Sequence, residues 1–323
     1  MRNNVMMTTS RLCTTAALFT ATFWATYPSP TSSLPAATTA SCDATYAMPR
    51  VRIIPNSKLF VSEPNPKWFG NKDNEENDPS WTNVNWLKSR FHFSFAEYNN
   101  QGNQNFGVLR VMNDDLVQPK RGFGTHGHSN MEILTYVVHG ELTHQDSMGT
   151  KETLGRGSIQ FMTAGTGVRH SEHNLGDTPL RFIQTWIVPQ TYGLTPRYGS
   201  LNGRNHQAEK KNQLRHLVSS VDSNEETPVK INQSVDGYAA ELEMSQSTTV
   251  HQKDERQAYL LCIEGELQVN GHPLKKYDAC EIVGGGPVEI IATNVESTEN
   301  GHVAHFLMYT MPEVPGSGRS DFQ

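Results

Sequence analysis

Short runs rich in aromatic and β-branched residues fill the chain from residue 81 onward. Examples lie at 91–95, 108–111, 132–138, 158–162 and 180–188, and glycine, asparagine or aspartate residues separate them. Such runs are typical of half-buried strands, and no stretch shows a convincing helical period of about 3.6 residues. Regularly spaced short strands joined by glycine-rich turns predict an all-β fold, either a sandwich or a barrel.

The strand pattern occurs in two blocks, which predicts two domains. A chain of 323 residues also exceeds what one hydrophobic core usually serves. We expect an N-terminal domain at 81–190 and a C-terminal domain at 229–312, joined by a polar and basic connection at 191–228. The remaining segments are interpreted as a linker with a surface loop at 43–80 and a tail at 313–323.

The second block carries two further signals. Its Gly265-Glu266-Leu267 repeats the Gly140-Glu141-Leu142 of the first block, which predicts that the second lobe repeats the architecture of the first. Asn270 and Gly271 lie between alternating runs, which predicts a two-residue β-hairpin turn.

Residues 1–42 differ from the rest in composition. Fifteen of them are Ser or Thr, and the only charged residues before Asp43 are Arg2 and Arg11. This composition is typical of a targeting leader, for a plastid, a mitochondrion or the secretory route. If the leader does not function, the protein is expected in the cytoplasm. Its apolar part is interrupted by Thr20 and Thr22 and is shorter than a bilayer requires, so no membrane span is expected.

Charge and cysteine usage exclude some classes of function. The net charge is -6 and the pI about 6.1, without the basic stripe that direct nucleic-acid binding requires. The four cysteines form no C-x-x-C pair. Cys262 and Cys280 lie in apolar runs, where we interpret them as buried free thiols rather than a disulfide.

Two short phrases carry the candidate chemistry: His126 with His128, and His170 with Glu172. Residues i and i+2 of a strand point to the same face, so each pair can direct two side chains at one point. One such pair usually reflects histidines that satisfy core hydrogen bonds, but two pairs about 40 residues apart fit neighbouring barrel strands and favour metal ligands. Three imidazoles and a carboxylate suit Fe, Mn, Co, Ni, Cu or Zn and leave open coordination positions.

The residues around these phrases resemble the pirin family. The resemblance rests on residues 122–140, 144–149 and 162–172, which hold both phrases, and on the flanking residues 86–87, 93–98 and 109–115. It is dense from about residue 81 to residue 198 and thin afterwards. Pirins are bicupins, so the resemblance implies two jelly-roll β-barrel lobes.

The same resemblance implies one divalent metal, held only in the N-terminal lobe by His126, His128, His170 and Glu172. Iron(II) is the metal it favours, with Ni, Co, Mn, Cu or Zn as alternatives. The C-terminal histidines agree with a lobe that lacks metal, since none form a His-x-His pair; they are His251, His272, His302 and His305.

Some residues around the site depart from the ligand pattern. Pirins usually carry proline between the first two histidines, where this chain has Gly127, and glycine loosens the backbone there. Glu132 is expected to support the site or line its pocket. His144 and Asp146 are expected to hydrogen-bond a ligand histidine, with direct ligation of the metal as the alternative.

Three functions are compatible with this pattern. The first is an oxidoreductase of the quercetin 2,3-dioxygenase type, closest to bacterial pirins, in which a flavonol or another small enolic substrate meets dioxygen and Glu172 is the general base. The alternative is a non-enzymatic, metal-dependent regulatory partner of a transcription factor or a metabolic enzyme. A storage or structural cupin is disfavoured because it needs no converging imidazoles. We expect a monomer.

Overall fold

The computed structural model describes residues 48–72, 85–203 and 211–314, and the regular secondary structure among them is almost entirely β-strand. The helices among them are two short 3-10 turns, η1 (Asn56–Lys58) and η2 (Pro66–Phe69). No helix in the described part of the chain is long and apolar enough to cross a bilayer. The prediction of an all-β chain is confirmed, while the expected leader at 1–42 lies outside the described residues.

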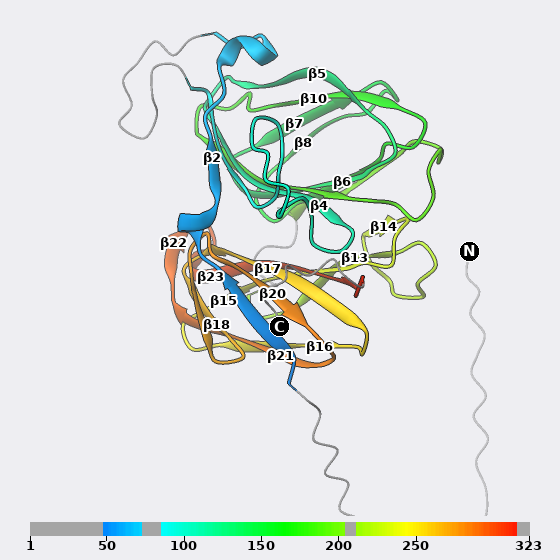
Figure 1. Ribbon diagram of the computed structural model, residues 1–323. Coiled ribbons are helices and arrows are strands. Elements are labelled where there is room, and N and C mark those ends of the chain that lie inside the picture. The colour runs from blue at the N-terminus through cyan, green and yellow to red at the C-terminus, as the bar shows by residue number, and fades with distance from the viewer. Residues whose placement is uncertain (1–47, 73–84, 204–210, 315–323) are drawn as a thin grey trace, which may run out of the picture. The chain divides into compact units, whose positions relative to one another are not determined.

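The N-terminal lobe consists of a 7-stranded sheet in the order β12-β9-β6-β11-β4-β3-β2 and a 4-stranded sheet in the order β5-β10-β7-β8. Figure 1 shows β2 in blue and the strands from β3 to β11 in cyan and green. Their bounds are β2 (Phe60–Ser62), β3 (Leu87–Phe91), β4 (Leu109–Val117), β5 (Gly122–His128), β6 (Glu132–His139), β7 (Leu142–Asp146), β8 (Lys151–Leu154), β9 (Ile159–Thr163), β10 (Val168–His173), β11 (Leu180–Ile187) and β12 (Arg197–Leu201).

The C-terminal lobe has the same construction. An 8-stranded sheet runs in the order β1-β20-β17-β23-β15-β13-β14, with β22 paired to β23, and a 4-stranded sheet runs in the order β16-β21-β18-β19. The bounds are β1 (Arg50–Ile54), β13 (Arg215–Ser220), β14 (Val229–Ile231), β15 (Asp236–Leu242), β16 (Ser247–Gln252), β17 (Arg256–Glu264), β18 (Glu266–Val269), β19 (His272–Lys275), β20 (Ala279–Val283), β21 (Gly286–Asn294), β22 (Glu296–Thr298) and β23 (Gly301–Pro312).

The two lobes repeat one topology. The strand order β9-β6-β11-β4-β3 matches β20-β17-β23-β15-β13, and the order β5-β10-β7-β8 matches β16-β21-β18-β19. Gly140 between β6 and β7 and Gly265 between β17 and β18 both have positive φ, 74° and 68°, which glycine adopts without strain. The hairpin at Asn270 and Gly271 also has positive φ at both positions, as its turn type requires.

Alternation of side chains along the strands divides the core into separate layers. One face of each large sheet contributes to a shared apolar cluster that includes Leu134 and Ile183 of the N-terminal lobe and Leu217 and Leu307 of the C-terminal lobe. The opposite faces fill the two barrels, as Phe182 does in the first lobe and residues such as Leu260 do in the second. Cys262 and Cys280 are buried free thiols, as predicted.

Two segments expected as connections contribute strands to the lobes. The range 43–80 contains β1, which pairs with β20 of the C-terminal lobe, and β2, which pairs with β3. Figure 1 shows β1 in blue beside the C-terminal strands. The range 191–228 contains β12, which pairs with β9, and β13, which pairs with β15. These strands are short and lie at or near the edges of their sheets, so their local pattern is weak. Most of the expected surface loop lies outside the described residues.

Candidate metal centre

The two sequence phrases lie on neighbouring strands of the small N-terminal sheet. His126 and His128 are on β5, His170 and Glu172 are on β10, and the two strands pair with His126 opposite His170. The ligand nitrogens of His126, His128 and His170 lie within 4.8 Å of one another. The structure therefore brings three of the predicted ligands to one point.

An irregularity in the strand pair determines which residues face each other. His126 is opposite His170, but Glu172 is opposite Phe123, so β5 carries one extra residue in this interval. A bulge of this kind bends a strand and redirects its side chains. Gly124 lies inside the bulge, where a Cβ would come within 2.9 Å of the Phe69 carbonyl oxygen. Glycine is therefore needed there for close packing of two backbones.

The tautomer of His126 follows from one hydrogen bond. Its Nδ1 lies 2.8 Å from the carbonyl oxygen of Gly124. Because a carbonyl oxygen only accepts, Nδ1 carries the proton and Nε2 keeps a free lone pair. A ring nitrogen fixed in this way is the usual arrangement of a metal-ligating histidine.

His170 gives the strongest sign that the cluster holds a cation. Its side chain is 2% exposed, and neither ring nitrogen has a hydrogen-bond partner. Buried polar atoms are almost always paired, so an orphaned imidazole at the centre of a histidine cluster fits a metal ion. Burial and the imidazoles of His126 and His144 lower the pKa of His170 to about 3. Burial and the imidazoles of His170 and His126 lower the pKa of His128 to about 3. Both rings are thus neutral at pH 7, the state that binds metal.

Glu172 lies beside this trio and is held by neutral donors. Its Oε1 accepts hydrogen bonds from Thr135 Oγ1 at 3.1 Å and Gln160 Nε2 at 2.9 Å, and its Oε2 accepts one from Gln184 Nε2 at 2.9 Å. The carboxylate groups with His170 and His144 within 4.8 Å. His170 is common to both groups, so a carboxylate is available next to the three imidazoles. This donor set fits a divalent transition metal.

The expected roles of His144 and Asp146 need revision. Instead of bonding a ligand histidine, they bond each other, with Nε2 and Oδ2 separated by 3.1 Å. Although burial would raise the pKa of Asp146, hydrogen bonds from His144 and two backbone N–H groups lower it. The His144 ring stacks on Tyr198 with centroids 4.6 Å apart. These contacts hold the His144 ring in place beside the His170 ring, with centroids 5.3 Å apart.

Glu132 is not a pocket residue. It lies on the face of β6 that packs between the lobes, and its carboxylate accepts hydrogen bonds from Thr163 Oγ1 and Asn232 Nδ2, each at 2.8 Å. The alternation along β6 explains the difference, because Glu132 shares its face with Leu134 and Tyr136 of the inter-lobe cluster.

A cavity of about 320 Å³ opens over the histidines. His126, His128 and Glu172 line it together with many apolar side chains. Its aromatic walls come from strands, from η2 and from the connection between β3 and β4, and comprise Trp68, Phe69, Phe91, Phe95, Phe123 and Trp186. Rings pack directly on the cluster, since the Trp186 ring lies edge-on to His128 with centroids 4.8 Å apart.

Sequence reasoning missed the polar residues of this cavity. Asn113, Asp115 and Gln184 line it with the aromatic side chains. Burial raises the pKa of Asp115 to about 8, which the nearby Asp114 and Glu172 carboxylates reinforce, so this side chain is neutral at pH 7. The i, i+2 spacing of Asn113 and Asp115 on a predicted strand is the signal that places both on one face.

Comparisons with known proteins agree with this geometry. Residues 74–187 match the family model Pirin, and residues 217–299 match the model of the quercetinase C-terminal cupin domain. The "Quercetin 2,3-dioxygenase" of Escherichia coli K12 is 41% identical over 197 residues, which are 60% of this chain and 82% of that protein. A "Pirin-like protein" of Caulobacter vibrioides is 38% identical over 208 residues, 64% of this chain and 88% of that protein.

Solved structures give the same result. The crystal structure of YhhW from Escherichia coli superposes with a TM-score of 0.67 at 30% sequence identity, and the match covers 82% of this chain and 99% of that one. The crystal structure of bacterial pirin YhhW from Escherichia coli in complex with nickel(II) superposes with a TM-score of 0.66 at 29% identity, over 82% of this chain and 100% of that one. With this sequence similarity, the duplicated cupin topology and the histidine cluster, the chain belongs to the pirin family.

Proposed function

We propose that this pirin is a dioxygenase of the quercetin 2,3-dioxygenase type, with one divalent metal on His126, His128, His170 and Glu172. Relatives that are named quercetin 2,3-dioxygenase support the proposal. A structural neighbour solved with nickel(II) supports it as well. We propose iron(II) as the working metal and nickel(II) as its first alternative.

The observation that carries the proposal is the orphaned imidazole of His170 beneath an aromatic cavity. Its two nitrogens have no partner, and the adjoining histidines line a cavity of about 320 Å³. A volume of this size suits a drug-sized planar ligand. Aromatic walls stack favourably on a flat conjugated substrate such as a flavonol and keep water from it.

A bound divalent cation would supply Lewis acidity that lowers the pKa of a hydroxyl group brought against it. The residues of the chain then determine where the proton goes. Glu172 is a carboxylate at the cavity wall and is the proposed acceptor for the 3-hydroxyl proton of the flavonol. Hydrogen bonds from Gln160 and Gln184 orient the carboxylate. Asp115, which is neutral at pH 7, offers a hydrogen-bond donor on the same cavity wall.

The test is flavonol turnover under air by metal-loaded wild type, by Glu172→Gln and by the metal-free protein. We expect loss of quercetin absorbance and release of carbon monoxide only with loaded wild type. Glu172→Gln should keep much of its metal through the three histidines but lose turnover. Equal rates in all three samples would show adventitious oxidation. If fully loaded wild type turns over no flavonol, the regulatory alternative replaces this proposal.

A further inference from the structure

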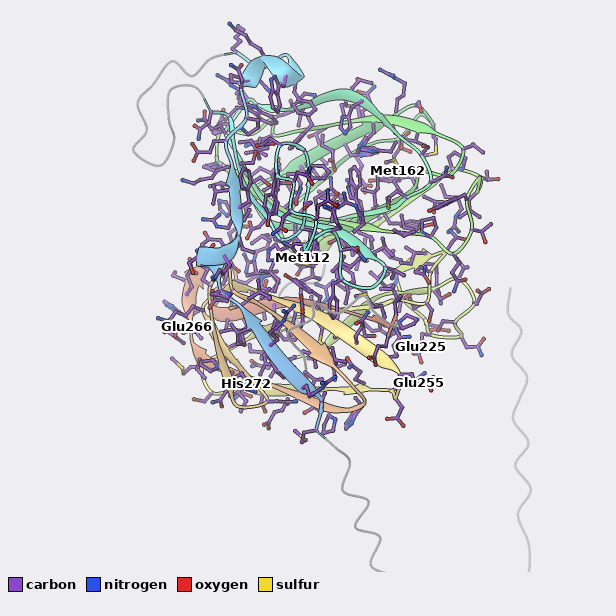
Figure 2. The ribbon with its side chains drawn as sticks, in the orientation of Figure 1. Met112, Met162, Glu225, Glu255, Glu266 and His272 are labelled. Atoms are coloured by element: carbon purple, nitrogen blue, oxygen red, sulfur yellow. The ribbon has the colours of Figure 1, made fainter. Side chains whose placement is uncertain are left out.

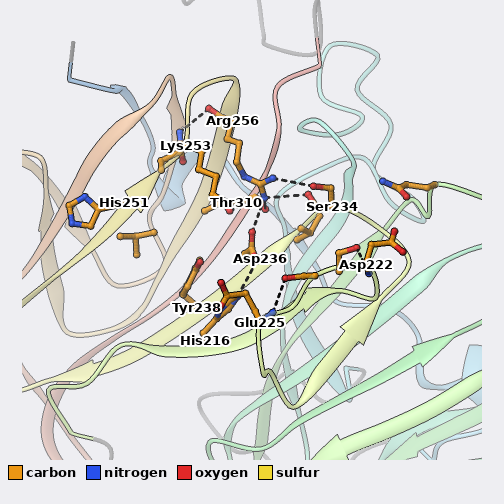
Figure 3. Close-up of a pocket in the computed structure, with 16 residues that line it drawn as sticks. His216, Asp222, Glu225, Ser234, Asp236, Tyr238, His251, Lys253, Arg256 and Thr310 are labelled. Carbon is orange, nitrogen blue, oxygen red and sulfur yellow. Dashed lines mark hydrogen bonds and ion pairs between the residues drawn. The ribbon is translucent and has the colours of Figure 1, made fainter. Parts of the chain in front are cut away.

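A cavity of about 490 Å³ opens in the C-terminal lobe, away from the histidine cluster. Figure 3 shows its lining side chains, which come from β13, β15, β16, β17 and β23, from the turns between them, and from Gln190 in the segment that follows β11. In the duplicated topology these strands correspond to β3, β4, β5, β6 and β11. Four of the latter line the aromatic cavity of the N-terminal lobe, so the two cavities occupy corresponding places in the two barrels.

The C-terminal cavity has a different chemistry. Where His126 pairs with His170 in the first lobe, Val250 of β16 pairs with Val288 of β21, and both valines are buried in the barrel core. The positions of His126 and His170 are thus taken by aliphatic side chains. Any ligand of this cavity must be recognised by other groups.

Polar side chains form a layer at the mouth of this barrel. On β15 the inward residue Ala240 is part of the apolar core, whereas Asp236, on the same face, lines the cavity. On β16 the next inward residue after Val250 is Gln252, and Arg256 is the first residue of β17. Because inward positions alternate along each strand, these polar groups converge at one end of the barrel.

A hydrogen-bonded network holds this layer in place. Arg256 Nη2 donates to Asp236 Oδ2 and to Thr310 Oγ1, both at 3.1 Å, and His216 Nε2 lies 3.1 Å from Asp236 Oδ1. The His216 ring stacks on Tyr238 with centroids 4.6 Å apart and an interplanar angle of 21°. The cavity therefore has fixed polar walls and an aromatic side.

Gln252 contributes an acceptor that the protein does not use. Its Nε2 donates to the carbonyl oxygens of Arg256 and Gly284, at 2.9 and 2.6 Å. Carbonyl oxygens only accept, so these two bonds fix the orientation of the amide. The Oε1 atom is then left buried without a partner in a side chain that is 5% exposed. A buried acceptor in a cavity wall calls for a donor on a ligand.

The rim of the cavity carries both acidic and basic side chains. Asp222 and Glu225 line one side and Lys253 lines another, next to the paired Asp236 and Arg256. In the view of Figure 2, Glu225 lies at the outer edge of the C-terminal lobe. The carboxylates and the Gln252 carbonyl oxygen would repel an anionic ligand. Arg256 and Lys253 would repel a polycation. A hydroxyl group donates and accepts, so it suits walls of both kinds.

We propose that the C-terminal cavity binds a small neutral polyhydroxylated molecule of the monosaccharide or disaccharide class. One hydroxyl donates to Gln252 Oε1, others bond the charged rim, and a sugar face packs on the stacked rings of His216 and Tyr238. The site is independent of the metal centre and of the function proposed for it.

The experiment is a titration of the isotopically labelled full chain with glucose and with maltose, followed by backbone amide NMR. Putrescine and inorganic phosphate serve as probes of the competing charge classes. We expect saturable shifts at His216, Tyr238, Gln252 and Arg256 with a sugar alone. Gln252→Leu should weaken sugar binding roughly tenfold because one hydrogen bond is lost. Gln246→Leu, an exposed substitution in the same lobe, should leave the affinity unchanged.

Each other outcome overturns the proposal. If neither sugar shifts the amide signals of this cavity at tens of millimolar, the cavity is not a sugar site. If putrescine or phosphate causes the shifts instead, the proposed class of ligand is wrong. Equal affinity of Gln252→Leu and wild type removes the role of the buried acceptor. If Gln252→Leu does not fold, the shift map of wild type decides alone.

Discussion

The inter-lobe contact contains a buried charge network whose removal has a calculable effect. Arg156, with a side chain 1% exposed, donates to both carboxylate oxygens of Glu264, at 3.0 and 2.6 Å, and also bonds Glu241 at 3.0 Å. His305 Nδ1 lies 3.1 Å from Glu264, and Tyr136 of the first lobe lies 2.9 Å from His305 Nε2. Although burial alone would raise the pKa of Glu264, hydrogen bonds from His305 and Arg156 hold it well below its usual range.

We predict that Glu264→Gln lowers the free energy of unfolding by about 3 kcal/mol. Removing one partner of a buried pair costs about 3 to 5 kcal/mol, because the remaining charge stays desolvated. The lower end applies here because Glu241 still neutralises Arg156. The double variant Arg156→Met with Glu264→Leu should recover part of the loss, since the Arg156 charge no longer stays buried without Glu264, and Glu241 keeps its hydrogen bond from Asn300.

Urea unfolding of the metal-free chain at pH 7 measures these differences. The pH dependence gives a second readout. Because the folded pKa of Glu264 is depressed, its contribution is present above the unfolded pKa of about 4.3 and is lost as pH falls below it. Wild type should therefore lose more stability than Glu264→Gln below about pH 4. This explanation is wrong if Glu264→Gln is as stable as wild type at pH 7, or if the double variant is less stable than Glu264→Gln.

Three further predictions concern the N-terminal lobe. Gly127→Ala should stabilise the chain by about 0.4 to 1 kcal/mol in thermal or urea unfolding, since a Cβ there meets only Val168 O at 3.8 Å and Arg169 Cγ at 3.9 Å; Gly124→Ala, the matched control, should destabilise it. Asp115→Asn should flatten the decline in stability of the metal-free chain between about pH 4 and pH 8, because the native state alone keeps that proton; an unchanged slope contradicts the raised pKa. His170→Ala should lose most of its metal in elemental analysis, and full retention would remove His170 from the site.

The sequence allowed the ligand strands to be predicted because strand alternation is a local property. His126 with His128, and His170 with Glu172, needed only their spacing to share a face. Spacing along the chain cannot predict the bulge in β5, because its extra residue is defined only by the pairing of β5 with β10. The hydrogen bonds from Gln160 and Gln184 to Glu172 likewise depend on pairing between distant strands.

Edge elements were harder to predict than central strands. β1 is 5 residues long and is paired only with β20, about 230 positions later, so nothing local signals it. The aromatic wall of the cavity includes Trp68 and Phe69 of η2, in a segment whose sequence indicates only a linker. Residues recruited from such segments are identifiable only after the chain has folded.

Anomalous diffraction from crystals of the metal-loaded chain, recorded at the absorption edge of the loaded metal, shows where the metal binds. We expect one strong peak per chain, bounded by His126, His128, His170 and Glu172. A peak of comparable strength in the C-terminal barrel, or a loaded chain with no peak among these four residues, would contradict this expectation.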